Sequence, residues 1–122
     1  MKILIGNTFP MSLVRRQVRI TPCELDFFKE FVGNGPVCSF WGHRNTLGAA
    51  NAFTGLDLTP KTERPAVVLD KDGFPTLDGE WFGQAFIISP TYKPGFRPQI
   101  GEEVKPEDIT GWQILHVQWE NN

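Results

Sequence analysis

Cysteine, histidine and long apolar runs are all scarce in this sequence of 122 residues. Its two cysteines, Cys23 and Cys38, form no Cys-x-x-Cys pair and no Cys/His spacing typical of a structural metal site. We therefore predict no metal and no other cofactor. We also expect both thiols to be reduced, with a disulfide between them as the alternative in an oxidising compartment.

No apolar stretch is long enough to cross a bilayer, and the apolar start of the chain is too short for the core of a signal peptide. We therefore expect a cytoplasmic protein without a membrane partner. The formal net charge is −2, so the chain lacks the basic excess that proteins use to neutralise a nucleic-acid duplex. That balance argues against duplex DNA or RNA as a partner, but a few local cations can still hold a small anion.

Apolar residues make up 40% of the chain, which is enough for the core of one domain. Runs rich in β-branched and aliphatic residues predict strands, and apolar residues at helical spacing predict two helices. The fold class that we predict is α/β: a compact single domain over residues 1–122, with a mixed β-sheet of about five or six strands flanked by two or three helices. The predicted strands are residues 2–6, 17–22, 36–42, 63–70, 81–89 and 112–120, the predicted helices are 23–35 and 43–53, and 105–110 is predicted to form one helical turn.

The stretch "WGHRNT" places a histidine at a corner, because an apolar run ends at Gly42 and a helical pattern begins after it. We predict a central strand, buried on both faces, for residues 36–42. The side chain of Asn45 or Thr46 is suited to cap the following helix, whose free backbone N–H groups favour an anion. His43 has an ordinary pKa near ~6.5, so it can exchange a proton with a phosphate bound there. The alternative is that His43 is itself a cap or a half-buried structural ring.

Two arginines, Arg64 and Arg97, each precede a proline, which holds the preceding residue extended. Such a guanidinium is suited to a bidentate phosphate contact, although a solvated loop arginine is the alternative. Asn7 and Ser12 follow the first predicted strand. If the first and third strands are parallel neighbours, Asn7 and His43 share the edge of the sheet where ligands commonly bind.

The second histidine, His116, alternates with apolar residues in the last predicted strand. We expect it to be a structural residue at the surface or at the edge of the sheet. The acidic pairs Glu102–Glu103 and Glu107–Asp108 are interpreted as a solvated loop and a helix start rather than as paired catalytic acids.

Several of these segments resemble, in order, the viral ring nucleases of type III anti-CRISPR systems. "NTFPMSLV" is similar to the family's Asn-x-Phe start, and "SFWGHRNTLGAANAFTGLDL" is similar to its Gly-His-x-Ser/Thr-Thr helix. "ERPAVVLD" resembles the arginine-led strand of the family, and "RPQIGEEVKPEDI" resembles its arginine, glycine and Glu-Ile pattern. The resemblance covers most of the chain and is most specific over residues 41–56.

The resemblance implies a homodimer that binds a cyclic oligoadenylate, cyclic tetra-adenylate in particular, at its twofold interface. It also implies metal-independent cleavage by a ribose 2′-hydroxyl, with His43 as general acid and Arg97 as the arginine near the reacting phosphate. General acid catalysis of this kind contributes typically ~10² to 10⁴ in rate. The substrate-binding residues that we predict on this basis are Asn7, Ser12, Asn45, Thr46, Arg64 and Gln84.

One position departs from the family pattern, because Ile100 stands where the family has a catalytic glutamate before a glycine. Three hypotheses therefore stay open. The first is a ring nuclease that counteracts type III CRISPR signalling, and the second is a module that sequesters a cyclic nucleotide without cutting it. The third is a viral structural or interaction protein in which His43 merely caps a helix.

Overall fold

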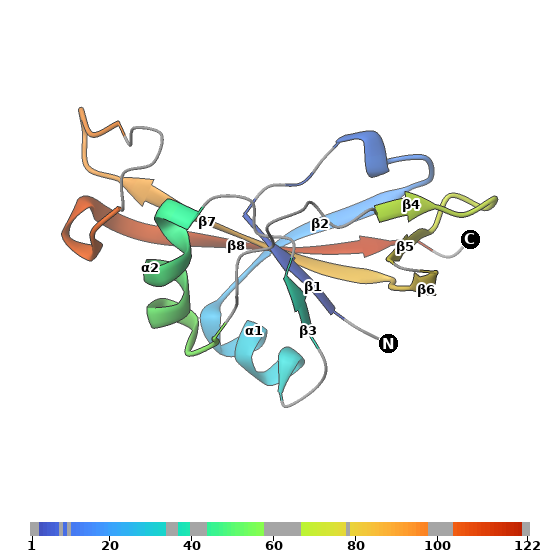
Figure 1. Cartoon of the computed structure of the whole chain (residues 1–122), viewed down its shortest axis with the longest axis horizontal. Coiled ribbons are helices and arrows are strands. Elements are labelled where there is room, and N and C mark those ends of the chain that lie inside the picture. The colour runs from blue at the N-terminus through green and yellow to red at the C-terminus, as the bar shows by residue number, and fades with distance from the viewer. Residues whose placement is uncertain are drawn as a thin grey trace.

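The computed structural model describes residues 3–7, 9, 11–33, 37–39, 44–57, 67–77, 79–97 and 104–120. Within these residues the chain forms eight strands, two α-helices and two short 3₁₀ helices (Figure 1). In chain order they are β1 (Ile3–Gly6), η1 (Met11–Leu13), β2 (Val18–Cys23), α1 (Leu25–Val32), β3 (Val37–Ser39), α2 (Arg44–Thr54), β4 (Val67–Leu69), β5 (Pro75–Leu77), β6 (Glu80–Trp81), β7 (Gln84–Tyr92), η2 (Pro106–Asp108) and β8 (Ile109–Trp119).

The strands form two sheets, and the larger one is mixed. Its order is β2-β8-β7-β1-β3, in which β1 is parallel to β3 and β7, while β8 is antiparallel to β7 and β2. The smaller sheet is an antiparallel meander of β4, β5 and β6. The long strands β7 and β8 run the length of the molecule, and the small sheet lies at the end opposite to α2 (Figure 1). The predicted mixed α/β architecture is confirmed.

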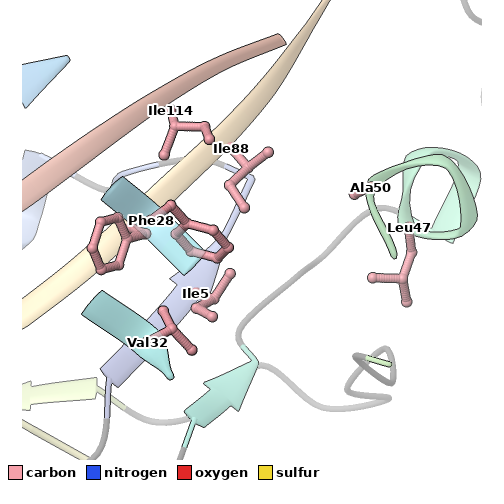
Figure 2. Close-up of a cluster of buried hydrophobic side chains, with 8 residues drawn as sticks. Ile5, Phe28, Val32, Leu47, Ala50, Ile88 and Ile114 are labelled. Atoms are coloured by element: carbon pink, nitrogen blue, oxygen red, sulfur yellow. The ribbon is translucent and has the colours of Figure 1, made fainter. Parts of the chain in front are cut away.

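One face of the large sheet is covered by both helices. Strand side chains alternate between faces, so Ile5, Ile88 and Ile114 project to the same side. Phe28 and Val32 of α1 and two residues of α2 complete this buried cluster (Figure 2). The members of the cluster are Ile5, Phe28, Val32, Leu47, Ala50, Phe86, Ile88 and Ile114.

The opposite face of the large sheet is covered by η1 and the small sheet over part of its length. Leu4, Ile87 and Val117, which alternate with the residues of the first cluster, are buried there against Leu13 of η1. Leu69 of β4 and nearby ring side chains pack at the margin. The sheet is thus buried on both faces where β1, β7 and β8 run together.

Arg16 connects three distant parts of the chain beside this second cluster. Its Nε donates to the carbonyl oxygen of Glu120 at 2.8 Å, and its Nη1 donates to that of Asp72 at 2.8 Å. The guanidinium carbon also lies 3.8 Å from the centroid of the Phe74 ring. This arginine therefore holds the turn before β5 and the end of β8 against the segment that precedes β2.

Helix α1 forms because Leu25, Phe28 and Val32 recur at helical spacing and bury one stripe against the sheet. The helix ends at Gly33, whose φ of 52° lies in the left-handed region that favours glycine. The N-cap residue, Glu24, makes no side-chain capping hydrogen bond. An eight-residue helix without such a cap depends on tertiary packing for its stability.

Three predicted elements differ from the structure. The strand predicted for residues 36–42 is not central, because β3 is an edge strand of the sheet that the described residues form. The strand predicted for 81–89 is divided, because the chain leaves β6 at Trp81 and enters β7 at Gln84. Gly83 lies in this break, where a Cβ would approach the Trp81 indole to 2.9 Å. Finally, β7 continues to Tyr92, into the segment predicted as a loop.

Candidate functional site

Strands β1 and β3 are parallel neighbours that end at the same edge of the large sheet. Ile5 of β1 is in register with Ser39 of β3, and β1 ends one residue later at Gly6. Asn7 is the first residue beyond β1, and the chain beyond β3 enters α2 at Arg44. The predicted meeting of these two strand ends is confirmed. Ligands commonly bind at such an edge, because loops and helix N-termini gather there.

The neighbouring strand β7 continues past the end of β1. Its pairing with β1 involves only Ala85 to Ile87, whereas β7 itself extends to Tyr92. The hydroxyl group of Ser89 donates to the carbonyl oxygen of Asn7 at 3.5 Å. Asn7 therefore lies against the side of β7, and the projecting part of β7 forms a wall beside the strand ends.

This wall is polar on the face turned away from the helices. Ser89 and Thr91 of β7 alternate with residues of the first buried cluster, and Gln113 of β8 is in register with Ser89. Thr91 and Gln113 are exposed. The sequence analysis missed all three as candidate site residues. The alternation of apolar and polar residues through 88–91 is the signal for Ser89 and Thr91, and it becomes relevant only because β1 stops before them. Gln113 is found only through its register with Ser89.

The N-terminal turn of α2 is the second part of this edge. Asn45 and Thr46 are the second and third residues of α2, so the expectation that one of them caps the helix was wrong, because the helix begins before both of them. The free backbone N–H groups of such a turn carry partial positive charge and favour an anion. His43 and Arg64, which the sequence analysis assigned to the same site, lie outside the described residues.

Ser12 and Arg97 are both exposed, but they belong to other parts of the fold. Ser12 is in η1, whose neighbour Leu13 is buried on the face opposite to the helices. Arg97 lies five residues beyond the end of β7, after a turn in which the Phe96 N–H donates to the carbonyl oxygen of Lys93 at 3.0 Å. A solvent-exposed guanidinium in this position is available to an anionic ligand.

Gln84 is separated from Asn7 along the sheet. It begins β7 next to Ala85, which is in register with Leu4 of β1, whereas Asn7 follows the opposite end of β1. At about 3.3 Å per residue along a strand, that offset amounts to roughly 13 Å. The Gln84 side chain is bonded instead to His116, since its Oε1 lies 2.7 Å from the histidine Nε2.

His116 is buried in the interior of the sheet, so the expectation that it lies at the surface or the edge was wrong. Its strand, β8, is flanked by β7 and β2, and only 6% of the residue is exposed. The ring stacks on Phe86 with centroids 4.7 Å apart, and the rings of Phe27 and Phe31 cover it from α1. Burial lowers the pKa of His116 below its ordinary value of 6.5.

Among the residues that the structure describes, no group of three His, Cys, Asp or Glu side chains is arranged to hold a metal ion. Cys23 is a free, half-buried thiol, and burial together with the nearby Glu24 carboxylate raises its pKa. None of the helices in the described ranges is long and apolar enough to cross a membrane.

The whole fold is similar to that of a viral protein. B116 of Sulfolobus turreted icosahedral virus superposes with a TM-score of 0.61, over 98% of this chain and 100% of that chain, at 17% sequence identity. At this identity the similarity concerns the fold alone. No family model matches the sequence, and no curated protein matches it either.

Proposed function

We propose that this protein binds a cyclic oligoadenylate, most specifically cyclic tetra-adenylate, and cleaves it without a metal ion. The observation that carries the proposal is the parallel pairing of β1 with β3. This pairing brings the start of the Asn7 segment next to the strand that leads into the "GHRNT" segment and α2. These are two of the segments on which the resemblance to the viral ring nucleases rests.

The proposed reaction is a transesterification that needs no water and no redox partner. A ribose 2′-oxygen attacks the adjacent phosphorus and its hydroxyl proton passes to solvent, while the bond from phosphorus to the 5′-oxygen breaks. The products are a 2′,3′-cyclic phosphate and a 5′-hydroxyl group, whose proton comes from the His43 imidazolium. The N-terminal turn of α2, with Asn45 and Thr46, holds the phosphate in line for this attack.

In this proposal Arg97 and Arg64 neutralise the charge that the phosphates carry, and Arg97 also stabilises the charge that develops at the reacting phosphorus. Asn7, Ser12 and Gln84 remain predicted ligand contacts. Ile100, in place of the family's glutamate, favours a second candidate function, in which the protein sequesters the ring without cutting it. The same strand-end site serves both functions.

The proposal includes a homodimer, whose twofold symmetry matches that of the ligand. A cyclic oligonucleotide of even ring size can lie on a twofold axis, so each local cation of one protomer is repeated by its partner. The doubled arginines offset the negative charge of the chain, which is −2 per protomer. Because the protein of similar fold belongs to a virus, we also infer a viral setting, in which the protein acts in the cytoplasm of the infected host.

The direct test is incubation of the purified protein with cyclic tetra-adenylate in excess EDTA, followed by chromatography of the products and by calorimetry. Linear products that end in a 2′,3′-cyclic phosphate support the nuclease. Tight binding of an intact ring supports sequestration instead. Absence of both binding and cleavage contradicts the proposal, whereas cleavage only in the presence of a divalent metal contradicts the mechanism.

Two variants separate the roles of the proposed residues. His43→Ala is expected to lose turnover and to retain binding, and Arg97→Ala is expected to weaken both. The matched control is Arg19→Ala, because Arg19 is an exposed arginine on β2, at the edge of the sheet opposite to β3. Equal losses in Arg19→Ala and Arg97→Ala would show that the ligand responds to overall charge rather than to this site.

A further inference from the structure

His116 is enclosed by groups from three elements. On β7, Phe86 stacks on the imidazole at an interplanar angle of 9°, and Gln84 binds its Nε2. From α1, the ring centroids of Phe31 and Phe27 lie 5.0 Å and 5.6 Å from that of the imidazole. Because an amide oxygen only accepts hydrogen bonds, Nε2–H donates to Gln84 Oε1, and this contact selects one neutral tautomer.

Within the described part of the chain, no charge compensates a proton on this ring. The charged residues of α1, which are Asp26, Lys29 and Glu30, are all exposed to solvent, as is Glu24 directly before the helix. On β2, Thr21 is in register with His116, and its same-face neighbours are the Cys23 thiol and Arg19, which pairs with Glu120 at 2.9 Å. The residues of β7 that contact the ring are uncharged.

Helix α1 is the element most easily displaced by a change at this ring. It has eight residues and no side-chain N-cap, so packing supplies most of its stability. The two rings with which it covers His116 are themselves half in solvent, since Phe27 is 45% exposed and Phe31 is 38% exposed. By contrast, β7 and β8 are held by a regular ladder of paired residues from Gln84 to Thr91.

We propose that His116 is an acid-sensitive latch, which keeps α1 on the sheet while the imidazole is neutral and releases the helix when the ring gains a proton. When α1 lifts, water reaches the imidazolium, and the exposed surface of Phe27 and Phe31 increases. The device does not require the ring nuclease proposal, although both involve Gln84. It nevertheless affects the same region, because the chain leads from α1 into β3 and then to α2.

The sign of the effect follows from the direction of the pKa shift. Burial lowers the pKa of His116 in the folded protein below 6.5, so the closed state binds its proton less tightly than the open state does. The latch is therefore fully effective above about pH 6.5 and weakens as the pH falls toward the folded pKa. Attraction between an imidazolium and the phenylalanine rings opposes this trend. The free energy of this attraction is smaller than the free energy lost when a buried ion gives up its hydration.

The experiment is amide hydrogen exchange of the full-length protein at several pH values between 4.5 and 8, corrected for the intrinsic dependence of exchange on pH. We expect the protection of the α1 amides to fall by up to about tenfold for each pH unit below 6.5, since the opening takes up one proton. Protection in β7 and β8 is expected to stay unchanged over the same interval. An NMR titration of the His116 ring measures its pKa directly.

Three variants make the test specific. His116→Gln cannot titrate, so α1 protection is expected to become flat between pH 5 and pH 7. Gln84→Glu places a carboxylate next to Nε2 and is expected to raise the pKa of His116, so that α1 stays closed at pH 6. Gln84→Met, which is similar in size and uncharged, is the matched control and is expected to keep the acid response. The two Gln84 variants preserve the test if His116→Gln does not fold.

Three outcomes would overturn the latch. The first is α1 protection that does not change with pH in the unmodified protein. The second is an equal decline in His116→Gln or in Gln84→Glu, which would assign the response to other groups. The third is a pKa of His116 at or above 6.5, because the neutral ring would then not be the form that the closed helix favours.

Discussion

Two adjacent phenylalanines of α1 provide a sharp test of the packing. Phe28 is 0% exposed and lies edge-on to Phe86 with centroids 5.0 Å apart, whereas Phe27 is 45% exposed. Replacing either residue by alanine changes the helix propensity of α1 in the same direction and by a similar amount. The difference between Phe28→Ala and Phe27→Ala therefore reports tertiary burial alone.

The expected magnitudes follow from those environments. Phe28→Ala leaves a cavity between α1 and the sheet and is expected to cost about 3–5 kcal/mol of unfolding free energy. Phe27→Ala removes a ring that is a little more than half buried, together with its contacts to His116 and Phe31, and is expected to cost about 1–2 kcal/mol. The two variants should thus differ by about 2–3 kcal/mol.

Urea unfolding followed by far-UV circular dichroism measures both losses, and measurement at two protein concentrations separates folding from dissociation of the proposed dimer. The slope m is expected to stay the same in both variants, so the difference appears as a shift of the midpoint. Equal losses, or a larger loss in Phe27→Ala, would refute the assigned orientation of α1 and, with it, the enclosure of His116.

Three further predictions concern other parts of the molecule. Arg16→Ala is expected to lower the unfolding free energy by about 1–3 kcal/mol, because two hydrogen bonds and a cation–π contact are lost. Arg19→Ala, which removes an exposed ion pair, is expected to lower it by less than about 1 kcal/mol. Gly83→Ala is expected to displace the Trp81 ring, which tryptophan fluorescence reports, at a cost of about 1–3 kcal/mol. Gln113→Ala is expected to weaken the proposed binding of cyclic tetra-adenylate about fivefold, as the loss of one hydrogen bond does, and to leave the urea midpoint unchanged. If the affinity measured by calorimetry does not change, the polar face of β7 and β8 is not part of the site.

Local periodicity predicts much of this fold. The spacing of Leu25, Phe28 and Val32 predicts α1, and the glycine that follows ends it as expected. The two-residue period of the last predicted strand and the small residues of α2 likewise correspond to observed elements. These signals are strong because each reflects contacts that an element makes with the core through a single stripe or face.

The order in which the strands lie side by side in the sheet could not be predicted from such local patterns. A continuous apolar run is typical of a buried strand, but it does not say how many neighbours the strand has, and β3 has only β1 within the described sheet. The same limit explains the error at His116. Its apolar neighbours in sequence indicate a strand, whereas its burial comes from α1 and β2, which lie about ninety residues earlier in the chain.

The candidate site combines predicted and unpredicted parts for a physical reason. Asn7 and the start of α2 were predictable, because the polar residues there follow directly upon strand ends. Ser89 and Gln113 were not, because they lie within regular strands and become site candidates only where β1 stops and β7 continues. A sheet with strands of unequal length thus creates polar surface from residues that carry no local sign of function.

Because the strands differ in length, the residues that stabilise the fold are largely distinct from the residues that we assign to the proposed chemistry. The two buried clusters hold the large sheet from both faces, and the first extends to Ile88 and Ile114, beyond the part of β7 that pairs with β1. Ile88 in the projecting part of β7 still belongs to the first cluster, whereas Asn7, Thr91 and Gln113 lie outside both clusters, so these three side chains can change with little cost to folding. Ile100, which stands where the resembling family has a glutamate, bears on the proposed cleavage. Similarity of fold at 17% identity does not determine an activity, so cleavage must be measured separately from binding.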